Sequence, residues 1–186
     1  MVYEEVIEGL TVRMRSVTEE DAEVTYKMRT DPVKSRFIHP MKGSVENQRE
    51  YIRKQRTVPN DFLFLIEDLN GKPIGMKGVY NYDSDANTIE TGRFIGFGSQ
   101  VQNIEALKLS FDFAFDVLKV KEIVMSALEN NSVMLGIQKK FGAKFVYRDR
   151  YDDLEYDSIH SVLTRDAYAL SKPKIERLIQ RFAGRK

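Results

Sequence analysis

The strongest constraint on the fold comes from the middle of the chain, where three apolar stretches are separated by two polar turns. Residues 62–67 form a short apolar run, and Asn70-Gly71 follows it. This dipeptide favours the tight turn of a β-hairpin. Residues 74–82 are the predicted returning strand, and the polar turn at 83–87 leads into a third strand at 88–97. The segment therefore predicts an antiparallel three-stranded meander.

The residues before the meander predict one strand and two helices. Residues 10–15 alternate between apolar and polar side chains, as a half-buried strand does. Thr18 can cap a helix that runs to about Arg29 and stops before Asp31-Pro32, because the residue before a proline disfavours helix. Ser44 begins a second helix in the same way.

The residues after the meander alternate between helices and strands. A helix predicted at 100–118 is apolar around most of its circumference and should be largely buried. Gly142 stands where the C-terminal cap of a shorter helix at 132–141 belongs. The predicted strands of this half are 122–127, 143–149 and 155–164. The full order predicts a mixed α/β (α+β) fold, in which helices flank a mostly antiparallel sheet of six or seven strands.

The end of the chain predicts a separate helix at 171–182. One face of it carries apolar side chains, namely Ile175, Leu178, Ile179 and Phe182. We expect a domain at 1–168 and a helical extension at 169–186, which docks on the domain or on a second subunit of a homodimer. Binding of this basic amphipathic helix to a membrane or polyanion is a less favoured alternative.

Composition excludes several kinds of site. The 186 residues contain no cysteine and two histidines, His39 and His160, so disulfides, thiolate metal sites and multi-histidine sites are excluded, and no metal is expected. The net charge of +1 gives no general attraction to nucleic acid or to an anionic membrane. No apolar stretch approaches the roughly 20 residues of a membrane span, and the acidic N-terminus does not read as a signal peptide. We therefore expect a cytoplasmic protein.

Several stretches, in this order, resemble one known family. They are the opening Leu10-Thr-Val-Arg-Met-Arg with Glu20-Asp21-Ala22, the segment Met28-Arg29-Thr-Asp31-Pro32, the central strand Glu90-Thr-Gly92-Arg-Phe-Ile-Gly96, the helix with Glu105-Ala-Leu107 and Phe113-Ala-Phe115, and the set Asn131, Lys140 and Gly142. Together they are similar to the GNAT acetyltransferase superfamily. They resemble most the branch that holds ribosomal-protein N-terminal, spermidine and aminosugar-nucleotide acetyltransferases. The resemblance covers about residues 9–168 and implies acetyl-coenzyme A (acetyl-CoA) as cosubstrate.

Two positions depart from the pattern of this family. The coenzyme loop is usually glycine-spaced, whereas residues 97–103 are two residues shorter and lack the inner glycines. The position of the tyrosine that protonates the leaving thiolate in many members is occupied by Gln138, which cannot donate that proton. Some members of the branch also lack this tyrosine.

The coenzyme is expected at the start of the helix at 100–118, because the first amides of a helix have no intrahelical partner and favour an anion. Ser99 and Gln102 fit a capping box, which would use one of these amides. The pantetheine arm would pair with the central strand, provided that the next strand splays away. The expected coenzyme-binding residues are Phe94, Ile95, Gly96, Ser99, Gln100, Val101, Gln102, Asn103, Ile104, Asn131 and Gln138.

The reaction also needs a base, since a lysine-like amine has a pKa of about 10.4 and is mostly protonated at neutral pH. Glu90, on the central strand, is the first candidate, although a salt-bridged surface glutamate is the alternative. Arg29, His39, Tyr80 and Tyr82 are candidate acceptor contacts, with loop packing and cross-strand packing as their alternatives. Less favoured candidates are His160 as a catalyst, Asp152 and Asp153 for a cationic acceptor, and Lys139 for a phosphate.

The resemblance therefore implies an N-acetyltransferase whose acceptor is a small-molecule or peptide amine, namely an aminosugar nucleotide, a polyamine or a protein N-terminus. A nucleotide-bearing acceptor should need basic or aromatic contacts, and a polyamine should need a cluster of carboxylates. The alternative is a catalytically degenerate member that binds a ligand or partner, which Gln138 and the missing glycines favour.

Overall fold

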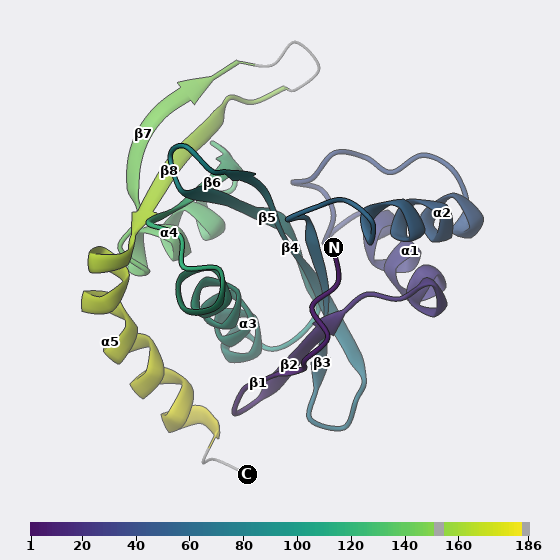
Figure 1. The fold of residues 1–186 in the computed structure, drawn as a ribbon, viewed down its shortest axis with the longest axis horizontal. Coiled ribbons are helices and arrows are strands. Elements are labelled where there is room, and N and C mark those ends of the chain that lie inside the picture. The colour runs from purple at the N-terminus through teal and green to yellow at the C-terminus, as the bar shows by residue number, and fades with distance from the viewer. Residues whose placement is uncertain (151–154, 184–186) are drawn as a thin grey trace.

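One mixed sheet organises the molecule (Figure 1). The computed structural model describes residues 1–150 and 155–183, and in this part the sheet has eight strands in the order β1-β2-β3-β4-β5-β6-β8-β7. Neighbouring strands are antiparallel, except that β5 and β6 are parallel. The strands are β1 Ile7–Glu8, β2 Val12–Ser16, β3 Phe62–Asp68, β4 Pro73–Asp83, β5 Thr88–Gly96, β6 Glu122–Leu128, β7 Lys144–Asp149 and β8 Ser158–Thr164.

The predicted fold class is confirmed, and the additional strand is β1. It has two residues, which is too short for any alternation to show in the sequence. Seven strands were predicted at positions that match β2 to β8. The three-stranded meander is β3, β4 and β5.

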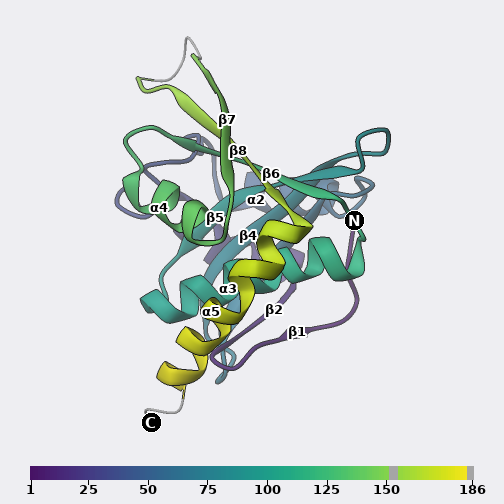
Figure 2. The same ribbon diagram turned by 90° about the vertical axis from the view of Figure 1, so that its left-hand side faces the viewer.

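Helices cover both faces of the sheet. The helices α1 (Ala22–Thr30) and α2 (Val45–Gln55) lie on one face, and α3 (Gln100–Asp112), α4 (Ser132–Lys140) and α5 (Arg165–Ala183) lie on the other (Figures 1 and 2). The helix predicted at 100–118 continues from α3 into a π-helical turn at Phe113–Val117. None of the described helices is both long enough and apolar enough to cross a membrane.

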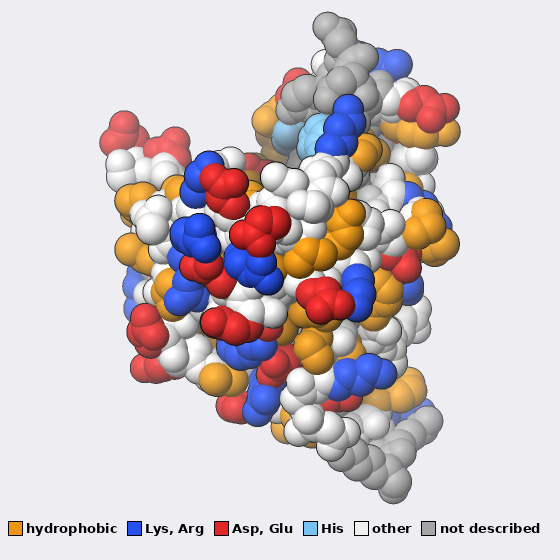
Figure 3. Space-filling model, turned by 90° about the vertical axis from the view of Figure 1, so that its right-hand side faces the viewer, with side chains coloured by type: hydrophobic (Ala, Val, Ile, Leu, Met, Phe, Trp, Pro, Cys, Tyr) orange, Lys and Arg blue, Asp and Glu red, His pale blue; other side chains and the backbone are white. Residues whose placement is uncertain are grey.

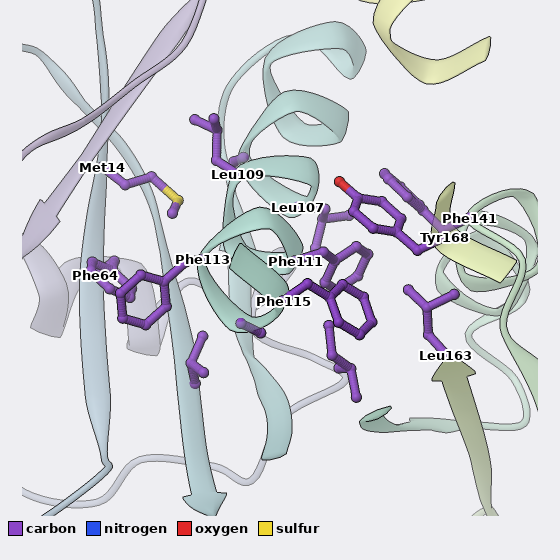
Figure 4. Close-up of a cluster of buried hydrophobic side chains, with 14 of the residues drawn as sticks. Met14, Phe64, Leu107, Leu109, Phe111, Phe113, Phe115, Phe141, Leu163 and Tyr168 are labelled. Atoms are coloured by element: carbon purple, nitrogen blue, oxygen red, sulfur yellow. The ribbon is translucent and has the colours of Figure 1, made fainter. Parts of the chain in front are cut away.

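Each face of the sheet has its own apolar core. The larger core lies between the sheet and the α3–α5 layer and contains six phenylalanines and Tyr168, most of them in edge-to-face contact (Figure 4). A smaller core packs Ile52 of α2 and Met28 of α1 against Leu63, Leu65 and Met76. Full burial of one such side chain stabilises the fold by about 1.5–3 kcal/mol. The strands between the two cores are therefore held from both sides.

The hairpin between β3 and β4 turns at Asn70-Gly71, as predicted. Gly71 adopts a left-handed conformation with φ +81°, whereas Asn70 is not among the left-handed residues. The Asp68 carboxylate accepts hydrogen bonds from the amides of Asn70 and Lys72. This side chain orders the turn, so a single left-handed residue is enough.

The C-terminal helix begins earlier than predicted. It was expected at 171–182, but α5 begins at Arg165 and runs through Pro173. Proline favours the first turn of a helix, so Pro173 in the sequence suggested a helix that begins near residue 171. Tyr168 is buried against α3, and the Ser171 hydroxyl donates to the Phe141 carbonyl. These contacts hold the upstream turn as helix. Ile175 and Ile179 are buried in the larger core, so the apolar stripe docks on the domain itself.

The face that carries α1 and α2 is covered by mixed charges (Figure 3). Some of them pair within one helix, as in Lys54–Glu50 and Lys27–Glu23, and Arg53 of α2 pairs with Glu19 before α1. Exposed pairs of this kind add little stability.

Candidate coenzyme and acyl-transfer site

The sheet opens between β5 and β6. The two strands pair only where Thr88–Glu90 faces Glu122–Val124, although β5 continues to Gly96 and β6 to Leu128. Beyond this point none of the described strands lies beside this edge of β5, and a cavity of about 600 Å³ lies there. The splay that a pantetheine arm would need is therefore present.

Six segments line this cleft. They are the loop 33–38 after α1, β4 through Lys77, the second half of β5, α3, the end of β6, and α4 with the residue before it. The charged side chains of the described lining are all cations, namely Lys34, Arg36, Lys77, Arg93 and Lys140. No carboxylate of the described residues lines the cleft. An anionic ligand is therefore favoured in it.

A β-bulge shapes the wall formed by β5. Arg93 has φ +53°, and the register with β4 shifts between the pairs Met76–Ile95 and Gly78–Gly92. The Arg93 guanidinium stacks 4.0 Å from the centre of the Tyr80 ring and donates to both oxygens of Asp61, at 2.7 and 3.0 Å. A bulge re-aims the residues beside it. Here it lies in the part of β5 that no longer pairs with β6.

Glu90 lies one residue before the open part of β5. Its carboxylate accepts hydrogen bonds from the Tyr80 hydroxyl at 3.0 Å and from the Asn81 amide at 2.9 Å. Burial, together with the charge of Glu90, raises the pKa of Tyr80 above its ordinary value. Tyr80 therefore stays a hydrogen-bond donor to Glu90 at neutral pH. The Glu90 side chain does not line the cleft, whereas Thr91 and Gly92 do.

The start of α3 lies at the Gly96 end of β5, at the other end of the open edge from Glu90. The predicted capping box is present: the Gln102 amide donates to the Ser99 hydroxyl and the Ser99 amide donates to the Gln102 side chain. The Asn103 amide donates to the Ser99 carbonyl. Gln100 through Ile104 were expected to offer amides to a phosphate. Of these, the Gln100 and Val101 amides donate to no acceptor among the described residues.

A second cavity, of about 760 Å³, continues from this point. It shares Gln100, Ile104 and Lys140 with the first cavity. Its other walls are the β3–β4 hairpin at 68–70 and the end of α5. The two cavities therefore meet at the N-terminus of α3, where the helix dipole adds to the positive potential.

Comparison with known proteins identifies the family. The family model described as "Acetyltransferase (GNAT) domain" matches residues 11–144. The chain belongs to the GNAT acetyltransferase family. Membership implies acyl transfer from acetyl-CoA as the general activity. No curated protein matches the chain significantly.

Solved structures show the same fold at low identity. Unliganded FdhC, described as a nucleotide-linked sugar GNAT, is 19% identical with a TM-score of 0.81, over 96% of this chain and 99% of that one. The spermidine N-acetyltransferase from Vibrio cholerae, in complex with CoA and spermine, is 13% identical with a TM-score of 0.76, over 85% and 98%. A GNAT-family acetyltransferase from Bacillus anthracis is 14% identical with a TM-score of 0.74, over 87% and 99%.

In this GNAT chain, α4 forms the wall opposite β5. Asn131 caps α4, since its side chain accepts the Met134 amide at 3.2 Å, and it also lines the cleft. Gln138 and Thr91 line the cleft and are 5% and 3% exposed. Gln138 Oε1 and Thr91 Oγ1 are buried and have no hydrogen-bond partner among the described residues. Buried polar atoms are rarely left unpaired, so these two atoms favour a polar ligand in the cleft.

Four other residues that were predicted from the sequence to contact a substrate or a phosphate do not line the cleft. Arg29 donates to the His39 carbonyl at 3.0 Å and so holds the loop that follows α1. The His39 side chain is exposed. Lys139 is also exposed, and its neighbour Lys140 is the lysine at the junction of the two cavities. Tyr82 is exposed and bonds Asn87. Contact between any of them and a substrate stays a prediction.

The spacing of Tyr80 and Tyr82 would put both side chains on one face of a regular strand, but β4 is not regular there. Asn81 between them has φ +53°, and the register of β4 with β5 shifts between Tyr80 and Asp83. The alternation of side chains is therefore broken. His160 stacks on Tyr147, with ring centres 4.3 Å apart, and its Nε2 lies 3.4 Å from Asp149, which fits a packed histidine. Asp152 and Asp153 lie outside the described residues.

None of the five cations of the cleft was proposed as a site residue from the sequence, and three of them show why. Lys77 is a lysine inside an otherwise apolar strand, which is the signal that could have singled it out. Arg93 stands beside Gly92 in the central strand, but nothing in the sequence marks the bulge. Lys140 was noted only as part of the resemblance.

Proposed function

We propose that this GNAT chain acetylates a primary amine of a small molecule that also carries an anionic group, such as a nucleotide-linked aminosugar. The observation that carries this proposal is the charge of the described cleft lining, with five cations and no carboxylate. The charge of the coenzyme accounts for part of this set. Arg36 of the loop after α1 and Arg93 of the bulge are assigned to the acceptor, whereas the Lys34 ammonium lies 5.9 Å from the centre of the Phe97 ring, beside the start of α3, and is assigned to the coenzyme.

The residues present fit acetyl-CoA. The amides of Gln100 and Val101, at the N-terminus of α3, would hold the pyrophosphate. The unpaired edge of β5, over Phe94, Ile95 and Gly96, would accept the amides of pantetheine. Asn131 and Gln138 would contact the arm from α4, while the second cavity would take the nucleotide end beside Lys140. The thioester supplies the acetyl group.

The alternative acceptors are less well supported. A polyamine carries only positive charge, and the described lining offers it cations. A peptide N-terminus has no need of two further basic side chains at its site. Phe37 of the loop and Phe94 of β5 add aromatic surface to the cleft, which suits a base or a sugar ring.

Glu90 is the proposed base. The acceptor amine must lose a proton before its lone pair attacks the thioester carbonyl. The Tyr80 hydroxyl and the Asn81 side-chain amide each donate to one oxygen of the Glu90 carboxylate and so fix its position. Because Glu90 lies just outside the cleft lining, it would take the proton through a water molecule.

Binding and turnover test the proposal directly. We expect acetyl-CoA to raise the melting temperature of the protein, and we expect acetylation of nucleotide-linked aminosugars ahead of spermidine and of peptide N-termini. Binding without turnover on any amine class would instead support the catalytically degenerate alternative, which the glutamine at position 138 favours.

A variant tests the base. Glu90→Gln keeps the shape of the side chain and should lower kcat by about 10²-fold, with the loss concentrated at low pH. Glu122→Gln, on the neighbouring strand and outside the cleft lining, is the matched control and should keep its activity. Unchanged turnover in Glu90→Gln would remove Glu90 from the mechanism.

A further inference from the structure

Lys77 is a buried lysine in the wall of the cleft. It is 3% exposed and lies in the middle of β4. Its cross-strand partner is Phe64, which belongs to the core on the α3 side, whereas the neighbouring Met76 belongs to the core on the α1 and α2 side. Because side chains alternate along a strand, Lys77 points to the α3 and α4 side of the sheet. Its ammonium lies 6.0 Å from the centre of the Phe94 ring.

The surroundings of Lys77 make it a proton carrier near neutral pH. Burial lowers its pKa to about 7, and the charge of Glu90 opposes this shift. Lys77 has no ion pair or hydrogen bond with any residue in 1–150 or 155–183. The other titratable groups that line the cleft, Lys34, Arg36, Arg93 and Lys140, are all cations. A buried lysine without a structural partner is costly, which favours a functional role.

The proposed reaction still needs a general acid on the α3 and α4 side of the sheet. When the C–S bond breaks, coenzyme A leaves as a thiolate, which needs a proton. Gln138 lines the same cavity but its amide is not an acid. Thr91 and Gln138 each present a buried, unpartnered oxygen there. Lys77 and Thr91 therefore line the cavity from the sheet, and Gln138 lines it from α4.

We infer that Lys77 is the general acid of the transfer, an inference that rests on the proposed function. The acceptor ammonium loses one proton to Glu90 through water, and the neutral amine attacks the thioester carbon, forming the C–N bond. The nitrogen of the tetrahedral intermediate loses a second proton to solvent, the C–S bond breaks, and the thiolate takes a proton from the Lys77 ammonium. The products are the amide and free coenzyme A; Glu90 returns its proton to solvent, and neutral Lys77 regains one from solvent. A thiol has a pKa of about 8.5, so transfer from an ammonium of lower pKa is favourable.

Substitution of Lys77 tests this assignment. Lys77→Met removes the proton while keeping the length of the side chain, and should lower kcat by roughly 10²-fold with little change in the Kd of coenzyme A. Lys77→Arg keeps the charge but holds its proton too tightly, so it should not restore kcat. Lys72→Met, an exposed lysine of the same hairpin, is the matched control and should behave as wild type.

A second readout separates proton transfer from a structural role. The alkaline limb of the kcat profile should disappear in Lys77→Met. Acetyl-seleno-coenzyme A has a more acidic leaving group, so the defect of Lys77→Met should shrink with it. A merely structural role would leave the defect the same for both donors, and this result would overturn the inference. Acetylation of Lys77 itself, seen by mass spectrometry, would also overturn it.

Different results would overturn the proposed function and the role of Lys77. If wild type binds acetyl-CoA but acetylates no amine, the proposed function fails, and the role of Lys77 falls with it. If wild type turns over and Lys77→Met keeps the same kcat and pH profile, only the role of Lys77 fails. Circular dichroism and the melting temperature check that each variant is folded.

Discussion

Gly92 shows how one residue of the central strand sets the geometry beside the cleft. A Cβ atom at this position would lie 2.2 Å from the Tyr80 hydroxyl oxygen. The Tyr80 side chain therefore passes over the bare backbone of Gly92 to reach Glu90, with Arg93 stacked on its ring. The glycine is needed for its lack of volume, since its φ is not among the left-handed ones.

Gly92→Ala should therefore displace Tyr80 and weaken its hydrogen bond to Glu90. We expect a loss of about 1–3 kcal/mol in the free energy of unfolding, as for other overpacked sites, and a fall in kcat of about tenfold. Urea denaturation and steady-state kinetics measure the two effects. Gly136→Ala is the stability control, because nothing lies within 4 Å of a Cβ there, and it should stabilise α4 by up to about 1 kcal/mol. Full stability of Gly92→Ala would show that Tyr80 has another way to pack.

At the scale of elements, the start of α3 combines two uses of the same amides. The Ser99 hydroxyl and the Gln102 side chain close a capping box, as Ser44 and Asn47 do at the start of α2. Gly96 lets α3 begin close to β5, since a Cβ there would lie 2.3 Å from the Asn103 side-chain oxygen. The cap stabilises the helix, but it also uses the Gln102 amide, which a phosphate would otherwise accept.

Ser99→Ala and Ser44→Ala form a matched pair for this element. Each should lower the free energy of unfolding by about 1 kcal/mol through loss of the cap. Only in Ser99→Ala can a bound phosphate take the freed amide. The increase in melting temperature on adding coenzyme A should therefore be larger for Ser99→Ala than for wild type, and unchanged for Ser44→Ala. A smaller increase in Ser99→Ala would mean that the Ser99 hydroxyl itself contributes to coenzyme binding.

At the scale of the whole molecule, one buried charge network joins the sheet to the layer of α1 and α2. Arg15 of β2 donates to Glu67 of β3 at 2.9 Å and to both oxygens of Asp21 at 2.7 and 2.9 Å. Asp21 also accepts the Thr18 amide at 2.8 Å, at the entry to α1. Burial alone raises the pKa of Asp21, but the hydrogen bonds from Arg15 and Thr18 outweigh it, so this pKa lies below its ordinary value.

The sign of this pKa shift predicts the pH dependence of stability. A carboxyl with a lowered native pKa stabilises the fold above its unfolded pKa of about 3.9, and this contribution is lost as the pH falls through the native pKa. Asp21→Asn should therefore be less stable than wild type at pH 7 by about 1.5–3 kcal/mol, and the difference should narrow in acid. Urea denaturation from pH 7 downward measures it. Glu23→Gln, which removes an exposed ion pair with Lys27, is the control and should leave the free energy of unfolding nearly unchanged. If the difference in free energy of unfolding between Asp21→Asn and wild type widened in acid, this role of Asp21 would be contradicted.

The sequence by itself determined the order and class of the elements, because their signals are local. The apolar runs of β3 to β5, the capping residues Ser44 and Ser99, and the turn glycine Gly71 each act within a few residues of the chain. The family resemblance placed Asn131 and Gln138 among the expected coenzyme-binding residues, and both line the cleft.

The tertiary structure alone decided which side chains meet at the site. The splay after Glu90, the bulge at Arg93 and the start of α5 at Arg165 depend on contacts between segments far apart in the chain. The same is true of Lys77. Its low pKa arises from burial beneath α3 and α4, and no neighbour in the sequence produces that burial. Local patterns record the energetics of single turns and strands, whereas burial and charge depend on everything that packs around a residue.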